Sequence, residues 1–96
     1  MQPIVSVIVL AYNQEKYIAQ CIEGILMQKA DFPFEIVIGE DFSVDRTREI
    51  VLAYKEKFPD KLHVILSSQN LGPAQNALQI QKNCQGKYLA LCEGDD

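Results

Sequence analysis

The stretch I-V-S-V-I-V-L, residues 4–10, decides the fold class. It is rich in β-branched residues and broken by one serine, which is typical of a strand buried on both faces of a parallel sheet. Three later runs have the same apolar character: F-E-I-V-I-G at 34–39, L-H-V-I-L at 62–66 and Y-L-A-L-C at 88–92. The sequence therefore predicts four strands.

The segments between these strands have the spacing of amphipathic helices. Apolar side chains recur at intervals of three and four positions over about 15–29, 47–58 and, more weakly, 74–86. Strict alternation of strand and helix predicts an α/β fold with right-handed crossovers and a parallel sheet that has helices on both faces. We expect residues 1–96 to form a single domain. Ligands of such sheets bind beyond the carboxyl ends of the strands.

The composition excludes several classes of protein. Of the 96 residues, 48% are hydrophobic and 23% charged, which rules out disorder and low complexity. A net charge of −4 with scattered basic residues argues against nucleic acids and anionic membranes as partners. The apolar run at 4–11 is too short to be a membrane segment, and no basic segment precedes it as in a signal peptide. The three cysteines lack C-x-x-C spacing, which favours a reducing cytoplasm over a disulfide framework or a zinc site.

The loop after the first strand contains no glycine. This excludes the G-x-G-x-x-G dinucleotide fingerprint and the Walker phosphate loop. The loop offers Tyr12 instead, whose ring can stack on a nucleotide base or pack on a sugar. The alternative is that Tyr12 only packs against the first helix, and position alone favours neither role.

Asp41 comes at the end of the second strand, beside Glu40. Its carboxylate can accept a hydrogen bond from a ring N–H, such as the imide of uracil or the edge of guanine. The alternative is that Asp41 or Asp45 caps the second helix, a role for which Asp45 is well placed. We expect Asp41 to contact a ligand.

Three carboxylates follow the fourth strand: Glu93, Asp95 and Asp96. Such a group suits a hard divalent cation, Mg²⁺ or Mn²⁺, shared with substrate phosphates, and Gly94 allows a sharp turn between the ligands. The alternative is a solvated acidic loop. We expect His63, which lies between apolar neighbours, to be structural or partly exposed rather than catalytic, and the three cysteines to be buried and inert.

Taken together, the four strand ends resemble family 2 glycosyltransferases, which have the GT-A nucleotide-sugar fold. The resemblance covers the chain from about residue 3 to residue 96, with four motifs in the family's order and spacing. The motifs are V-S-V-I-V-L-A-Y-N (5–13), E-I-V-I-G-E-D-F-S-V-D-R-T (35–47), N-L-G (70–72) and G-K-Y-L-A-L-C-E-G-D-D (86–96). The last is similar to the family's metal-binding D-x-D stretch.

This resemblance implies roles for particular residues. Tyr12 would pack on the nucleotide base, and Asp41 would hydrogen-bond it. Asp95 would contact the ribose or diphosphate, and Asp96 would bind the Mn²⁺ or Mg²⁺ that bridges the donor phosphates, with Glu93 as a weaker ligand. Family 2 enzymes invert the anomeric carbon, and their catalytic base lies beyond the D-x-D stretch. The chain would therefore be the N-terminal, donor-binding part of a longer enzyme, inactive by itself, with no catalytic residue up to Asp96.

The resemblance also implies partners and a location. The donor would be a nucleotide sugar, with UDP favoured over dTDP and GDP, and the acceptor would be a carbohydrate or a lipid-linked carbohydrate. The expected setting is bacterial polysaccharide biosynthesis in the cytoplasm, including the inner face of the membrane.

The sequence departs from the family pattern at five positions. Leu10 replaces a proline, Glu40 an aspartate and Phe42 a glycine. Gln75 stands where many members have an arginine, so the phosphate contact of that arginine is not expected here. Glu93 replaces the first aspartate of D-x-D, which leaves Asp95 and Asp96 as the preferred metal ligands.

Two alternatives to a family 2 glycosyltransferase differ in how well they fit the sequence. A signalling receiver domain would have clustered acids after the first strand and a phosphoacceptor aspartate after the third, where this chain has Ala-Tyr-Asn and Ser-Ser. A non-catalytic nucleotide-sugar-binding module remains the alternative to an enzyme.

Overall fold

The four strands form one parallel sheet in the computed structural model, which describes residues 2–28 and 31–93. The strands are β1 (Val5–Ala11), β2 (Phe34–Glu40), β3 (Leu62–Leu66) and β4 (Tyr88–Glu93). Their order across the sheet is β3-β2-β1-β4, and every neighbouring pair is parallel. The chain thus runs outward from β1 through β2 to β3, and then returns to place β4 on the other side of β1. The strand order reverses at β1, which makes the carboxyl end of this strand the topological switch point.

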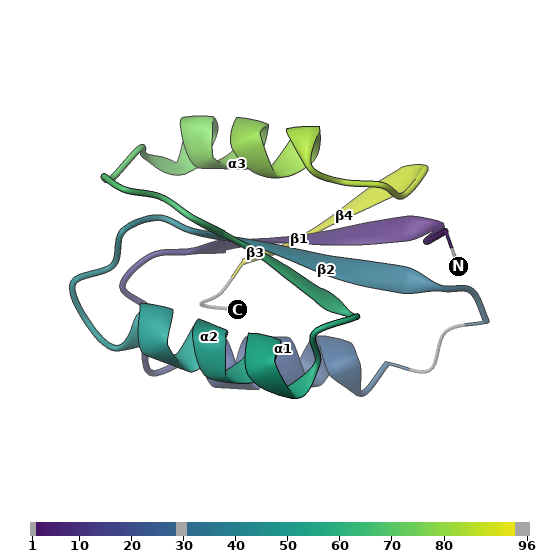
Figure 1. The fold of residues 1–96 in the computed structure, drawn as a ribbon, viewed down its shortest axis with the longest axis horizontal. Helices are drawn as coiled ribbons and strands as arrows, with labels where there is room; N and C mark the ends of the chain where they lie inside the picture. Colours follow the sequence, from purple (N-terminus) through teal and green to yellow (C-terminus); the bar gives the residue numbers. More distant parts are fainter. Residues whose placement is uncertain (1, 29–30, 94–96) are drawn as a thin grey trace.

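Helices cover both faces of the sheet, as Figure 1 shows. α1 (Ile18–Leu26) and α2 (Thr47–Lys57) lie on one face, and α3 (Pro73–Lys82) lies on the other. The predicted α/β class, with helices on both faces of a parallel sheet, is confirmed. None of the helices in the described ranges is long and apolar enough to cross a membrane.

The two faces of the sheet carry separate apolar clusters. Val9 and Ile38 are fully buried on the face of α1 and α2. Ile8, Val37 and Ile80 form the cluster beneath α3. The near-continuous apolar runs of the sequence follow from this arrangement, because successive side chains of β1 and β2 enter a core on either face.

α1 begins at Ile18, three residues later than the spacing predicts. The amide of Tyr17 donates to the carbonyl of Gln14, which makes a turn before the helix. The amide of Gln14 donates to the side chain of Thr47, in the segment that follows β2. Thr47 is the first residue of α2, so this contact joins the loop after β1 to α2 and fixes the chain ahead of α1.

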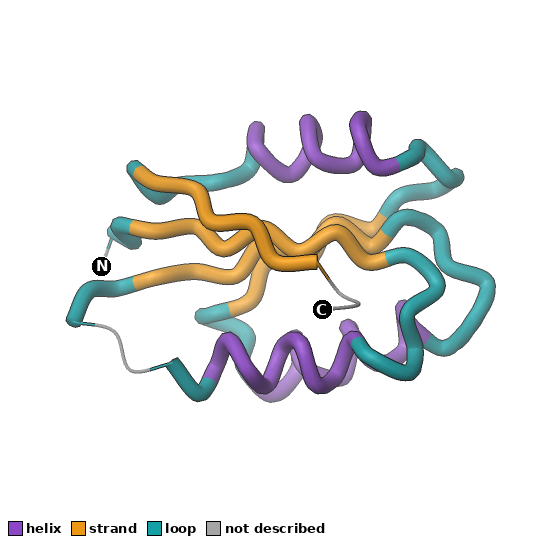
Figure 2. Tube along the Cα trace, turned by 180° about the vertical axis from the view of Figure 1, so that it is seen from behind, coloured by secondary structure: helices purple, strands orange, loops and turns teal. Residues whose placement is uncertain are grey.

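α3 begins at Pro73, as expected for proline in a first turn, and ends at Lys82, before the predicted limit. The chain then returns to the sheet through Gly86, where an added Cβ would lie 2.6 Å from the backbone nitrogen of Ser6. Glycine is therefore required for β4 to reach its place beside β1. Figure 2, the view from behind, shows that the loops that follow β1, β2 and β3 lie at the same end of the sheet.

Candidate nucleotide-binding site

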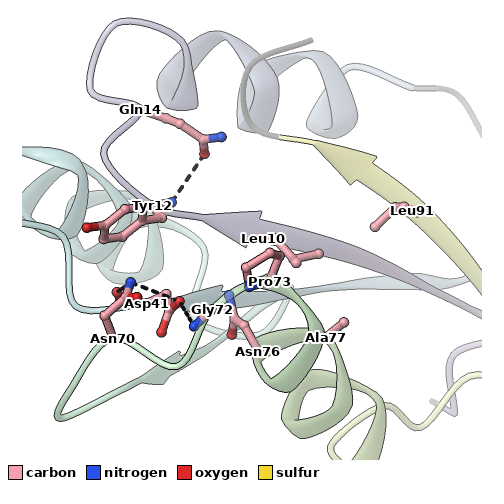
Figure 3. Close-up of a pocket in the computed structure, with 10 residues that line it drawn as sticks. All are labelled: Leu10, Tyr12, Gln14, Asp41, Asn70, Gly72, Pro73, Asn76, Ala77 and Leu91. Carbon is pink, nitrogen blue, oxygen red and sulfur yellow. Dashed lines mark hydrogen bonds between the residues drawn. The ribbon is translucent and has the colours of Figure 1, made fainter.

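A pocket of about 410 Å³ lies at the carboxyl ends of β1 and β2, beside the beginning of α3. Figure 3 shows Tyr12, Asp41 and Asn70 at one end of it, and Leu91 and Ala77 at the other. The remaining lining residues are Leu10, Gln14, Gly72, Pro73 and Asn76. Two of the residues predicted to contact the nucleotide, Tyr12 and Asp41, are thus brought to one pocket at the switch point.

Tyr12 is 43% exposed and is not part of either core cluster. Its backbone amide donates weakly to Oε1 of Gln14, 3.3 Å away, while its ring lines the pocket (Figure 3). A half-exposed ring at a pocket wall leaves a face for a planar ligand. Its stacking on a base remains a prediction.

Asp41 is buried, and its carboxylate holds the loop before α3. Oδ1 accepts the amide of Leu71 at 2.7 Å, and Oδ2 accepts the amide of Gly72 at 2.9 Å. The side-chain amide of Asn70 donates to Oδ2 at 3.2 Å and also to the Asp41 carbonyl. The N-L-G segment (70–72) is therefore hydrogen-bonded to the carboxylate at the end of β2. The sequence analysis did not predict this contact.

These hydrogen bonds exclude the alternative that Asp41 caps α2. Its carboxylate is directed to the loop before α3, so it does not cap α2. Among the residues that the structure describes, Oδ1 accepts one hydrogen bond, and a carboxylate oxygen can accept two. The carboxylate thus has room for one more donor, and base recognition by Asp41 stays a prediction.

Asp45 binds the start of α2, as predicted, but from the position before the N-cap residue, which is Arg46. Its Oδ1 accepts the amide of Thr47 at 2.9 Å, and its Oδ2 accepts the amide of Glu15 at 3.3 Å. Burial opposes ionisation of Asp45, but the hydrogen bonds from Thr47 and Glu15 outweigh it and lower the pKa of the carboxyl group. Asp45 therefore binds both the start of α2 and the loop after β1.

Asn13 joins the loops after β1 and β2. Its backbone has a positive φ of 48°, a conformation that asparagine tolerates better than most residues. Its amide donates to Oγ of Ser43, and its Oδ1 accepts the amide of Val44, both at 2.9 Å. Asn13 of the first motif and Ser43 and Val44 of the second thus hold the two loops together.

A second network supports the site from the face of α2. Glu40 is fully buried, and its Oε1 accepts Nε of Arg48 at 2.7 Å. Nη2 of Arg48 donates to the carbonyl of Ser67, at the end of β3, at 2.6 Å. Arg48 also lies over the ring of Phe42, 5.7 Å from its centroid, and Phe42 has a φ of 60°, which is strained for a bulky residue.

The glutamate at position 40 is explained by this network. Its carboxylate accepts both the guanidinium of Arg48 and the amide of Ser43. Sequence reasoning recorded Glu40 only as a replacement for aspartate. The sequence pattern that could have indicated this ion pair is an acid at the end of a strand with an arginine eight positions later.

The predicted metal ligands fall almost entirely outside the described residues. Asp95 and Asp96 lie beyond them, and Glu93 is described by its backbone alone, which pairs beside Leu10 at the end of β4. Within 2–28 and 31–93, no group of three His, Cys, Asp or Glu residues could hold a metal ion. The acidic stretch nevertheless begins at the same edge of the sheet as the pocket, since Leu10 lines it.

His63 is partly exposed, as predicted. Its Nε2 lies 3.3 Å from Oε1 of Glu35, a buried carboxylate whose Oε2 accepts the hydroxyl of Ser6 and the amide of Gln85. This group lies toward the amino ends of the strands, away from the pocket. The prediction that all cysteines are buried is wrong for Cys84 and Cys92, which are half-buried, and right for Cys21.

The fold and the site define an α/β domain with a ligand pocket at the switch point of a parallel sheet. The family described as "Glycosyl transferase family 2" matches residues 6–96, and the chain belongs to that family. The resemblance stated from the motifs is therefore confirmed.

The chain is 35% identical over 95 residues to the putative teichuronic acid biosynthesis glycosyltransferase TuaG of Bacillus subtilis (strain 168). The aligned segment covers 99% of this chain and 37% of TuaG. Its structure is similar to the mannosyltransferase PcManGT from Pyrobaculum calidifontis in complex with GDP-Man and Mn²⁺, with a TM-score of 0.85 and 26% identity over 99% of this chain and 28% of that one. It is also similar to S. aureus TarS 1-349 in complex with UDP, with a TM-score of 0.83 and 34% identity over 96% of this chain and 27% of that one. The chain thus spans well under half the length of each of these proteins.

Proposed function

We propose that this chain is the donor-binding part of an inverting, cation-dependent glycosyltransferase that uses a UDP-sugar. The observation that carries the proposal is the pocket at the switch point, with a half-exposed tyrosine ring on one wall and a buried carboxylate beside it. Family membership and the two solved relatives, which are complexes with GDP-Man and with UDP, support a nucleotide sugar as the ligand.

In this proposal the base occupies the end of the pocket near Tyr12 and Asp41. The ring of Tyr12 stacks on the base, and Oδ1 of Asp41 accepts the imide N–H of uracil. The network that holds Asp41 fixes the position of its carboxylate, which favours a charge-assisted bond. The sugar and diphosphate then extend along the edge of the sheet toward β4.

The acidic stretch after β4 would hold the cation. Asp96 and Asp95 are the proposed ligands, with Glu93 as a weaker one, and Asp95 also contacts the ribose or diphosphate. Mn²⁺ or Mg²⁺, when bound, offsets the charge that develops on the departing nucleotide diphosphate. The described carboxylates near the pocket do not compete for this role, because Glu40 is paired with Arg48 and Asp41 with backbone amides.

The rest of the reaction belongs to the full-length protein. We propose a carbohydrate or lipid-linked acceptor, whose hydroxyl is deprotonated by a base beyond Asp96, and a cytoplasmic location in bacterial polysaccharide assembly. The uncovered share of each relative leaves ample chain for an acceptor site.

The test is calorimetric titration of the full-length protein with UDP, GDP and dTDP in the presence of Mn²⁺, followed by the same titration in EDTA. We expect UDP to bind most tightly and to lose most of its affinity in EDTA. A preference for GDP or dTDP would overturn the assignment of uracil, and equal affinity with and without the cation would overturn the metal site. Transfer to an added acceptor would separate an enzyme from a non-catalytic sugar-nucleotide binder.

A further inference from the structure

Two cysteine sulfurs are in contact on the face of the sheet that carries α1. Cys21 lies on α1 and Cys92 near the end of β4, 71 positions later, and their Sγ atoms are 3.2 Å apart. A disulfide bond requires about 2.0 Å between its sulfurs, so side-chain rotations that bring the two sulfurs about 1.2 Å closer would allow the bond to form. The fold thus brings together two thiols that the sequence keeps far apart.

This pair faces a groove on the surface. The groove measures about 380 Å³ and is lined by both cysteines together with Gln20, Gly24, Ile25 and Gln28. Cys92 is half-buried, whereas Cys21 is only 6% exposed. A small oxidant that enters the groove reaches Cys92 first and finds Cys21 directly behind it.

Cys84 provides an internal contrast. It packs against the apolar cluster beneath α3, on the opposite face of the sheet. Its thiol donates to the carbonyl of Ile80 at 3.3 Å. Burial is the main cause that raises the pKa of Cys84; a hydrogen bond with Ser6 opposes it, and the charge of Glu35 adds a smaller increase. Cys84 is therefore held as a thiol, the less reactive form.

We propose that Cys21 and Cys92 form a site of reversible oxidation by hydrogen peroxide. The thiol of Cys92 attacks the peroxide, which yields a sulfenic acid and one water. The thiol of Cys21 then attacks the sulfenic sulfur, which forms the S–S bond and releases a second water. Two thiols are oxidised and one peroxide is reduced to two waters; a dithiol reductant restores the pair by exchange.

The cross-link would join α1 to the carboxyl end of β4. In the described part of the chain, β4 pairs with β1 alone, so the disulfide gives this strand a second, covalent attachment. Glu93 follows Cys92 directly, so the attachment falls where the acidic stretch begins. The formation of the bond itself does not depend on what that stretch binds.

The experiment uses the full-length protein carrying Cys84→Ser, treated with hydrogen peroxide and mapped by mass spectrometry without reduction. We expect a linked peptide that contains Cys21 and Cys92, lighter by two hydrogen atoms than the two thiol peptides together. The melting temperature should rise on the order of 10 °C, because the bond closes a long loop, and dithiothreitol should reverse both changes.

Two matched variants, Cys21→Ser and Cys92→Ser, should lose the linked peptide and the rise in melting temperature. If Cys92 gains oxygen atoms while Cys21 stays open to alkylation and no linked peptide forms, the proposal is overturned. It is equally overturned if the unsubstituted protein links either cysteine to Cys84 instead.

Discussion

Replacement of Tyr12 by alanine distinguishes a ring that binds a base from a ring that packs the fold. The side chain is 43% exposed. An aromatic side chain presents roughly 150–250 Å² of surface, so a ligand could cover about 65–110 Å² of this ring. At about 25 cal/mol per Å² this burial is worth about 1.6–2.7 kcal/mol, within the range of about 1–3 kcal/mol for a stacked base.

We therefore expect Tyr12→Ala to weaken UDP binding by the full-length protein about 15- to 100-fold. Tyr12→Phe should restore most of the affinity, because stacking needs the ring and not the hydroxyl. Stability should fall by less than the roughly 3–5 kcal/mol that truncation of a fully buried aromatic costs. Calorimetric titration with UDP and thermal unfolding of the same purified variants measure both quantities.

Tyr17→Ala is the matched control. Tyr17 is 50% exposed, close to Tyr12 in exposure, and it lines a different pocket at the start of α1. Its truncation should leave UDP affinity within about twofold of the parent. The reasoning is refuted if Tyr12→Ala lowers the melting temperature strongly while the folded fraction binds UDP as tightly as the parent.

Four further predictions concern the other residues of the site. Asp41→Ala should weaken UDP binding by roughly 1.5–3 kcal/mol and also destabilise the loop before α3, whereas Asp41→Asn, which keeps one acceptor oxygen, should lose less of both in calorimetry and thermal melts. Asp96→Ala should abolish the difference in UDP affinity between Mn²⁺ and EDTA; a difference that persists would exclude this ligand. Arg48→Met should cost roughly 3–5 kcal/mol in urea denaturation because it leaves Glu40 buried without its cation, and adding Glu40→Gln should recover part of that loss. The carboxyl group of Asp45 has a pKa below its usual 3.8, so it stabilises the fold above that pH, and this contribution is lost as the pH falls through the folded-state pKa. Asp45→Asn should therefore make the melting temperature fall less steeply with decreasing pH in the acid range. A profile of melting temperature against pH that the substitution leaves unchanged would contradict the assignment.

Much of the fold could be predicted because its signals are local. The strand at 4–10 and the run at 34–39 are apolar on successive residues, and only a sheet covered on both faces accommodates that pattern in strands of this length. The alternation of strand and helix then leaves few topologies. The order β3-β2-β1-β4 follows that logic, and it places the loops after β1 and β2 at the switch point.

The contacts that hold the site could not be predicted in the same way, because they join segments about thirty positions apart. Asn13 binds Ser43, and Asp41 binds Leu71, through bonds that depend on how two loops meet in space. Periodicity carries no information on such meetings. The late start of α1 has the same cause, since the amide of Gln14 finds its acceptor on Thr47 rather than within a longer helix.

The double engagement of Asp41 bears on how the pocket would bind its ligand. Its carboxylate is already ordered by Leu71, Gly72 and Asn70, so the same bonds that fix the acceptor also fix the adjacent loop that lines the pocket. A ligand that meets a fixed acceptor does not have to lose further side-chain entropy at that position, which favours affinity. A carboxylate that has given up solvent for backbone amides also has less water to displace when a base arrives. In the proposed complex, Asp41 would therefore act on the ligand both by direct contact and by fixing the loop beside it, and the comparison of its alanine and asparagine variants separates the two contributions.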